Sequence, residues 1–326
     1  MALTMLVVVI VVALAFEYIN GFHDSANAIA TVVSTKVLTP RQAILFGAVF
    51  NIAGAFAGTH VAKTIGAGIV DAAGVTQTVI LCALAAAIVW DLLTWWFGIP
   101  SSSSHALIGG LIGASVAKAG IGVVNVKGVF AKVIVPMVTS PLIGFVFGIF
   151  VMIGLVWLVY QWIPGKVDRY FRRFQLLSSG VMAFSHGSND AQKTMGIITL
   201  SLFAYGALKS VEVPIWVIVL CAVTMGLGTM AGGWRIIRTM GSKIIKLKPI
   251  HGFAAETSAA AVILTASHFG IPVSTTHVIS TSIMGVGSAQ RFSALRWGIA
   301  GNIVLAWVLT IPVCMVIASV LYLVFA

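Results

Sequence analysis

Charged side chains are scarce in this chain. Asp, Glu, Lys and Arg together make up 8% of its 326 residues, whereas a soluble domain contains about 25% of them. Apolar residues account for 60% of the chain, and the mean hydropathy is +1.08. The composition therefore excludes an ordinary soluble domain and predicts an integral membrane protein.

Motifs of membrane enzymes and pumps are also missing. The sequence contains neither a Walker A pattern nor a G-x-S-x-G elbow, which argues against an ATP-driven pump and against a hydrolase. The three cysteines, Cys82, Cys221 and Cys314, lie in apolar segments and are expected to pack rather than to form a disulfide or bind a metal. We therefore predict that the chain is not an enzyme and has no cofactor.

Acidic residues are rarer than basic ones, with 8 Asp and Glu against 19 Lys and Arg and a net charge of +11. The basic residues gather in short connections, chiefly 166–173 and 235–248. This pattern is typical of the positive-inside rule, with the basic loops beside anionic lipid headgroups. We expect a lipid bilayer as the partner and no nucleic acid.

The apolar segments are long and lack alternation with period two, which favours a helical bundle over a barrel. Ten of them are expected, at roughly 4–22, 42–62, 78–98, 106–118, 133–163, 175–186, 213–234, 254–270, 278–290 and 296–325. A span needs about 20 residues. The segments 106–118 and 278–290 are therefore predicted to be half-helices or re-entrant pieces. The fold class is an all-α, polytopic membrane helical bundle.

The sequence repeats internally. Three pairs of segments match in the same order: GFHDSANAIA (21–30) with GSNDAQKTMG (187–196), KTIG (63–66) with RTMG (238–241), and IPSSSSHALIGGLIG (99–113) with IPVSTTHVISTSIMG (271–285). Such order is typical of an internally duplicated transporter. We predict a first transmembrane repeat over 1–162, a basic cytoplasmic connection over 163–174 and a second repeat over 175–326.

The basic loops also predict the orientation. No basic residue precedes Lys36, so the first apolar run lacks the charged region of a secretory signal and is expected to remain as a helix. Placing the loop of Lys36 and Arg41, and the loop 235–248, in the cytoplasm puts the N-terminus outside. Corresponding loops of the two halves then lie on opposite sides, which predicts inverted-topology repeats in the cell membrane.

Two acids stand at equivalent positions of the repeat, Asp24 and Asp190, with the amides of Asn27 and Asn189 close by. A charge near the bilayer centre is costly unless it faces partners or water. Carboxylate and amide oxygens suit a hard cation such as Na⁺. The alternative is a structural pair that joins helix to helix. For the other acids of apolar segments, Glu17, Asp91 and Glu256, and for Lys193 beside Asp190, the sequence leaves the role open.

Hydroxyl residues follow a proline in both halves, in PSSSSH (100–105) and PVSTTH (272–277). Proline followed by Ser or Thr predicts a helix start. The free N–H groups and the dipole of such a start attract an anion. Two starts facing each other would make a pocket for an oxyanion, whereas plain helix capping is the alternative. The matching His105 and His277 are either ligands or structural residues.

The duplicated GFHDSANA and HGSNDAQKTMG segments, with SSSSH and STTH, resemble the inorganic phosphate transporter (PiT) family over about residues 12–326. The resemblance implies two inverted repeats with re-entrant hairpins, a homodimer, and transport of phosphate with Na⁺ in many members or H⁺ in others. The family's Asn-Asp pair matches Asn189 and Asp190, but His23 and Asp24 replace it in the first half.

The residue chemistry and the resemblance together predict two ligand sets. The sodium set is Asp24, Asn27, Ser104, Asn189, Asp190 and Thr276. The phosphate set is Ser102, Ser103, Ser104, Gln192, Thr275 and Thr276. We predict Na⁺- or H⁺-coupled symport of inorganic phosphate by alternating access. A sulfate or molybdate permease of the same fold, and a passive anion channel, remain the alternatives.

Overall fold

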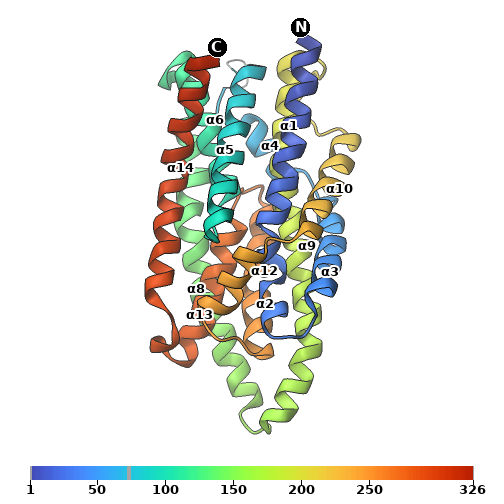
Figure 1. Cartoon of the computed structure of the whole chain (residues 1–326), viewed down its shortest axis with the longest axis vertical. Helices are drawn as coiled ribbons and strands as arrows, with labels where there is room; N and C mark the ends of the chain where they lie inside the picture. Colours follow the sequence, from blue (N-terminus) through green and yellow to red (C-terminus); the bar gives the residue numbers. More distant parts are fainter. Residues whose placement is uncertain (1, 72–74, 326) are drawn as a thin grey trace.

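The computed structural model describes residues 2–71 and 75–325, and these are helical over most of their length (Figure 1). The helices of the first half are α1 (Ala2–His23), α2 (Ser25–Ser34), α3 (Pro40–Ala55), α4 (His60–Ala67), α5 (Gln77–Phe97), α6 (Ser103–Ala119), α7 (Val126–Val129) and α8 (Val135–Val159). Those of the second half are α9 (Pro164–Tyr205), α10 (Ile215–Ala231), α11 (Trp234–Arg238), α12 (Pro249–His268), α13 (Thr275–Gln290) and α14 (Trp297–Phe325). Short π-helical turns follow α7 and α11, and short 3₁₀ turns precede α7 and α14.

The helices are long and apolar enough for a multi-pass membrane protein. Four segments of the described chain could each cross a membrane: Ala2–Ser34, Gln77–Phe97, Val126–Val159 and Trp297–Phe325. Two bent pairs raise the number to six if each pair forms one span. The α3–α4 pair bends by 73° and the pair of α10 with the segment Trp234–Lys243 bends by 61°, so each half of the chain contains one broken helix pair.

Two hairpins meet inside the bundle. In Figure 1, α5 descends from the upper end and α6 returns upward, whereas α12 rises from the lower end and α13 returns downward. The chain reverses at Gly98 and Gly270, which have φ of 67° and 65°. A left-handed glycine just after a helix, followed by a nearby proline, is a common helix stop. The hairpins thus match the short half-helices expected from the sequence, and they enter from opposite ends.

The segment 163–174, which we predicted as a connection, is helical. Pro164 is the first residue of α9, a single helix of 42 residues that runs to Tyr205. Proline is favoured at the first helical position, and the following Lys, Arg, Gln and Leu residues are good helix formers. The charged connection and the apolar segment 175–186 therefore form one continuous helix, and its N-terminal turns carry most of the charge.

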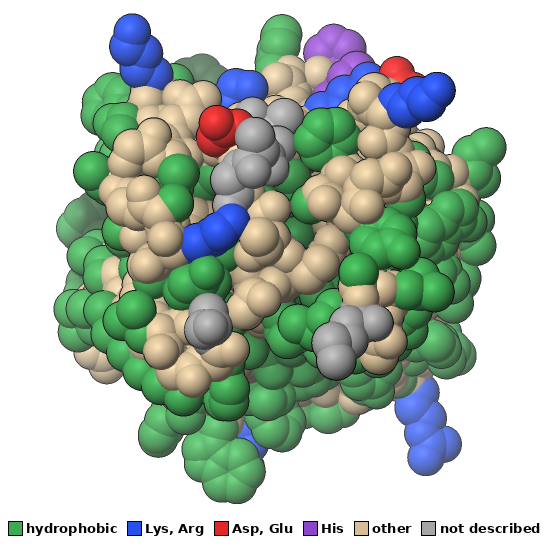
Figure 2. Space-filling view, turned by 90° about the horizontal axis from the view of Figure 1, so that it is seen from above, with side chains coloured by type: hydrophobic (Ala, Val, Ile, Leu, Met, Phe, Trp, Pro, Cys, Tyr) green, Lys and Arg blue, Asp and Glu red, His purple; other side chains and the backbone are tan. Residues whose placement is uncertain are grey.

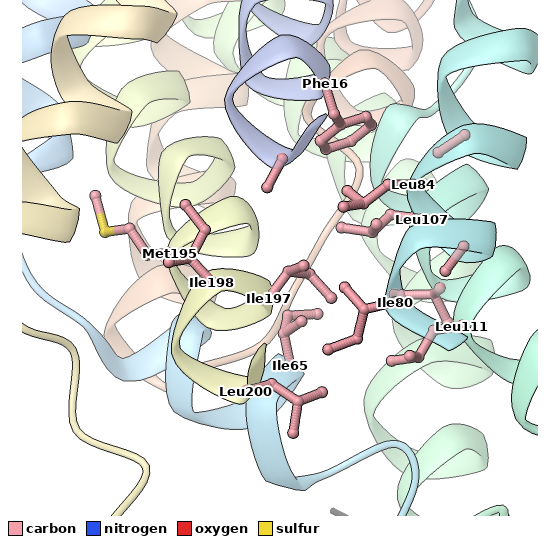
Figure 3. Close-up of a cluster of buried hydrophobic side chains, with 14 of the residues drawn as sticks. Phe16, Ile65, Ile80, Leu84, Leu107, Leu111, Met195, Ile197, Ile198 and Leu200 are labelled. Carbon is pink, nitrogen blue, oxygen red and sulfur yellow. The ribbon is translucent and has the colours of Figure 1, made fainter. Parts of the chain in front are cut away.

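Apolar residues fill the space between the helices and also cover the outside. Figure 3 shows part of one buried cluster, in which Phe16 of α1, Leu84 of α5 and Leu107 of α6 lie close together. Large apolar side chains such as Trp157 and Ile215 are 77% and 78% exposed. Figure 2 shows hydrophobic side chains around much of the rim at the end that carries both termini. Such an outer surface suits contact with lipid.

Candidate functional site

The two repeated acids come together in the middle of the bundle. Asp24 lies at the break between α1 and α2, and Asp190 lies inside α9; they are 3% and 0% exposed. Ligand atoms of Asp24, Asp190 and His186 all lie within 4.8 Å of one another. The repeat therefore places both carboxylates in one buried cluster, although they are 166 residues apart in the sequence.

The hydroxyl stretches form the starts of α6 and α13. Ser102 caps α6, its Oγ accepting from the backbone N–H of His105 at 3.2 Å. Ser274 caps α13 in the same way, accepting from His277 N at 3.3 Å. The rings of His105 and His277 have their centroids 4.9 Å apart, so the first turns of the two helices lie side by side. The proline-hydroxyl pattern thus predicted both helix starts correctly.

Hydrogen bonds join the start of α13 to both acids. Thr276 Oγ1 donates to Asp24 Oδ2 and Thr275 Oγ1 donates to Asp190 Oδ2, each at 3.3 Å. Asn27 Nδ2 donates to the Thr275 and Thr276 hydroxyls at 3.2 and 2.9 Å. Asn27, the two threonines and the two acids therefore form one buried network.

Two amide oxygens beside this network have no hydrogen-bond partner among the described residues. They are Oδ1 of Asn27 and Oδ1 of Asn189, and both are buried. Buried polar atoms are usually satisfied, so unpaired ones need an explanation. The amide nitrogen of Asn27 belongs to the network, whereas that of Asn189 donates to Ser267 Oγ and Ile271 O. Amide and carboxylate oxygens are ligands that a hard cation prefers.

The ammonium of Lys193 occupies the second half of the site. Its Nζ lies 2.7 Å from Asp190 Oδ1, donates to Val273 O at 3.0 Å and donates to Ser104 Oγ. Of the two roles that the sequence left open for this lysine, the ion pair with Asp190 is the one observed. Ser104 and Asp190 were predicted to bind sodium, but in this structure both contact the lysine.

Gln192 lies apart from the hydroxyl residues. Its Oε1 accepts from the backbone N–H groups of Val61 and Ala62, at 2.8 and 3.4 Å. N–H groups in the first turn of a helix such as α4 have no acceptor within the helix, so Gln192 supplies the missing acceptor. Its side chain also lines a cavity of about 200 Å³ that includes His60 and His268. The predicted grouping of Gln192 with the serines and threonines is therefore not seen.

His186 was not predicted as part of the site. Its Nε2 lies 3.6 Å from Asp190 Oδ2, and its Nδ1 lies 3.0 Å from Asn51 Oδ1. The available signal was its spacing, because residues four apart share one helix face. In the first half His23 lies beside Asp24, with Nδ1 2.6 Å from Oδ1. Each acid thus has a histidine neighbour.

Of the remaining buried acids, Glu17 and Asp91 lie close enough to the cluster of Asp24 and Asp190 to interact with it electrostatically. Glu256 accepts hydrogen bonds from Thr31, Ser178 and Gln175, and Glu17 accepts from Thr194. Asp91 is also fully buried. The structure does not bring Glu256 into the network of Asp24 and Asp190, so its hydroxyl partners mark a separate polar contact between α2, α9 and α12.

Comparison with known proteins identifies the family. The sequence profile of the phosphate transporter family matches residues 20–318. The chain belongs to this family. A "probable low-affinity inorganic phosphate transporter" of Rhizobium meliloti is 51% identical over 99% of this chain and 97% of that protein. A protein of the same description from Bacillus subtilis is 47% identical over 98% of this chain and 97% of its own length.

A solved structure agrees with this assignment. It is described as "the sodium-dependent phosphate transporter", has a TM-score of 0.86 and 27% sequence identity, and the match covers 98% of both chains. The resemblance inferred from the repeated motifs is therefore confirmed, as is the membrane helical bundle. This chain has His23 beside Asp24 and Lys193 beside Asp190, and the structure places both residues inside the site.

Proposed function

We propose that this chain carries inorganic phosphate across the cell membrane together with a cation, Na⁺ or H⁺, by alternating access. One observation carries the proposal most: the hydroxyl-rich starts of two oppositely directed helices lie beside a pair of buried carboxylates. The family and the descriptions of its members support phosphate as the anion. The sodium-dependent structural neighbour supports a coupled cation.

The anion is proposed to bind at the helix starts. Free backbone N–H groups, hydroxyls and the helix dipoles favour negative charge there. The proposed ligands are Ser102, Ser103, Ser104, Thr275 and Thr276, all at most 3% exposed. Gln192, which we had grouped with them, is no longer proposed as a phosphate ligand. Its amide oxygen already accepts hydrogen bonds from two backbone N–H groups of α4, beside a separate cavity.

The cation is proposed to bind beside Asp24. The carboxylate, the unpaired amide oxygen of Asn27 and the hydroxyl of Thr276 are buried together. Asn189, with a second free amide oxygen, is the proposed ligand from the other half. Ser104 and Asp190 both contact Lys193, so we no longer propose them as cation ligands; Ser104 stays among the proposed phosphate ligands.

Coupling follows from charge. Without a cation, Asp24 repels phosphate; at ~4 Å and an effective dielectric constant of ~20, such a pair of charges costs roughly 4 kcal/mol. A cation at Asp24 removes this repulsion, so each ion binds tightly only when the other is present. Rocking of the two repeats about the fixed site would then expose it to either side of the membrane.

The proposal keeps the predicted orientation and assembly. Both termini lie at the same end of the molecule in Figure 1, so an extracellular N-terminus implies an extracellular C-terminus. The predicted division into repeats and the homodimer remain parts of the proposal as well.

The coupling is tested by measuring phosphate affinity in buffers that differ in Na⁺ and, separately, in pH. The wild type is expected to bind phosphate more tightly when the coupling cation is present. Asp24→Asn is expected to abolish that dependence, whereas Asp168→Asn, an exposed change on α9, should keep it. If the phosphate affinity of the wild type changes with neither Na⁺ nor pH, the proposal is rejected.

A further inference from the structure

The two halves of the site differ at one equivalent position. Asn27 stands three residues after Asp24, and Lys193 stands three residues after Asp190. Asn27 donates to the two threonine hydroxyls of α13 and keeps a free amide oxygen. Lys193 instead brings a positive charge into the buried centre, where it is 2% exposed.

The contacts of Lys193 are those of a bound cation. Its Nζ touches a carboxylate oxygen of Asp190, the hydroxyl of Ser104 and the carbonyl of Val273. The three oxygens come from α9, from the start of α6 and from the turn before α13. Carboxylate, hydroxyl and carbonyl oxygens are also the ligands of hard alkali cations. The ammonium thus occupies a cage of the kind that Na⁺ would fill.

The same contacts use the whole donor capacity of the lysine. An ammonium has three N–H donors and no acceptor, and three acceptors surround this one. No N–H is left over for an oxyanion at the helix starts. This argues against Lys193 as a direct phosphate ligand.

We propose that Lys193 is a built-in cation, tethered to α9, which replaces one transported cation at the Asp190 half of the site. With Asp190 neutralised by the chain itself, Asp24 is the member of this pair that still needs a mobile cation before phosphate can bind. This inference rests on the proposed function and specifies it further. According to this inference, Lys193 determines how many cations are carried with each phosphate.

The test is to count bound ²²Na⁺ at saturating phosphate in purified protein. The wild type is expected to bind at most one Na⁺ per phosphate. Lys193→Asn, which introduces the residue type found at the equivalent position 27, is expected to bind one Na⁺ more than the wild type. Its phosphate affinity should also become more dependent on Na⁺. Lys193→Met fills the space without supplying a ligand, and it should weaken phosphate binding without gaining an ion. Lys63→Asn, an exposed change on α4, is the matched control and should behave as the wild type.

Two results would overturn the inference. One is a Lys193→Asn protein that binds phosphate with the same number of Na⁺ ions as the wild type. The other is a wild type that binds two or more Na⁺ per phosphate, a result that needs no variant and so decides the matter even if Lys193→Asn does not fold. A wild type that binds no phosphate at all would instead contradict the proposed function.

Discussion

At the scale of single residues, the two halves of the site share their acids but not their neighbours. Asp24 is flanked by His23 and faces Asn27 and Thr276, whereas Asp190 pairs with Lys193. The carboxylates therefore stand at matching positions of the sequence repeat, but their side-chain partners differ. The fixed positive charge of Lys193 beside Asp190, and the unpaired amide oxygen of Asn27 in the half that contains Asp24, divide the site into an occupied half and a receptive half.

Thr276 is the residue that links the receptive half to the helix start. Thr276→Val keeps the shape but removes the donor to Asp24 and one acceptor for Asn27. Loss of a partner by a buried polar group costs about 1–3 kcal/mol, so cation and phosphate affinity should fall together by roughly 10- to 100-fold. Equilibrium binding of both ions would measure the effect.

The matched control for this change is Thr139→Val. Thr139 lies on the exposed side of α8, where its hydroxyl donates to Val135 O of the same helix, and its replacement should leave both affinities as in the wild type. If Thr276→Val also binds both ions normally, then the α13 hydroxyl is not part of the site.

At the scale of elements, the site depends on two tight reversals that bring the starts of α6 and α13 into the bundle. At each reversal, a glycine with positive φ is followed by the sequence Ile-Pro, and the second helix of the hairpin begins shortly after it. These reversals were predictable from the sequence, because glycine, proline and Ser or Thr influence the backbone conformation of their immediate neighbours. The sequence did not show that α9 runs unbroken from Pro164 to Tyr205, since charge in the segment 163–174 looks the same in a loop and in an exposed helix end.

The reversals can be tested by Gly98→Ala and Gly270→Ala. A left-handed backbone costs a residue with a Cβ about 1–2 kcal/mol. The new Cβ would also lie 3.2 Å from Arg235 O in the first case and 3.0 Å from His60 O in the second. Both variants should unfold at lower temperature in detergent than the wild type.

Gly301→Ala provides the comparison for these two changes. Gly301 lies in α14, and no described atom lies within 4 Å of the position that a Cβ would take. Because alanine is also the better helix former, this variant should be at least as stable as the wild type. Equal stability of all three variants would show that the reversals do not need glycine.

At the scale of the whole molecule, the sequence repeat predicted which segments meet inside the bundle. We could predict that Asp24 lies near Asp190, and the serine run near the threonine run, because equivalent segments of an internally repeated bundle are expected to meet at its centre. The hydrogen-bond and ion-pair partners of individual side chains could not be predicted from the sequence. Lys193 had two possible roles, Gln192 turned to the start of α4, and His186 was overlooked, because such contacts depend on rotamers and on neighbours distant in the sequence.

The central claim is that buried acids and opposed helix starts couple an anion to a cation. Its most direct test uses liposomes that contain the purified chain, with equal phosphate on both sides and an imposed gradient of Na⁺ or, separately, of pH. We predict that one of these gradients drives phosphate to accumulate above its outside concentration. Uptake that stops at equal concentrations under both gradients would contradict the account.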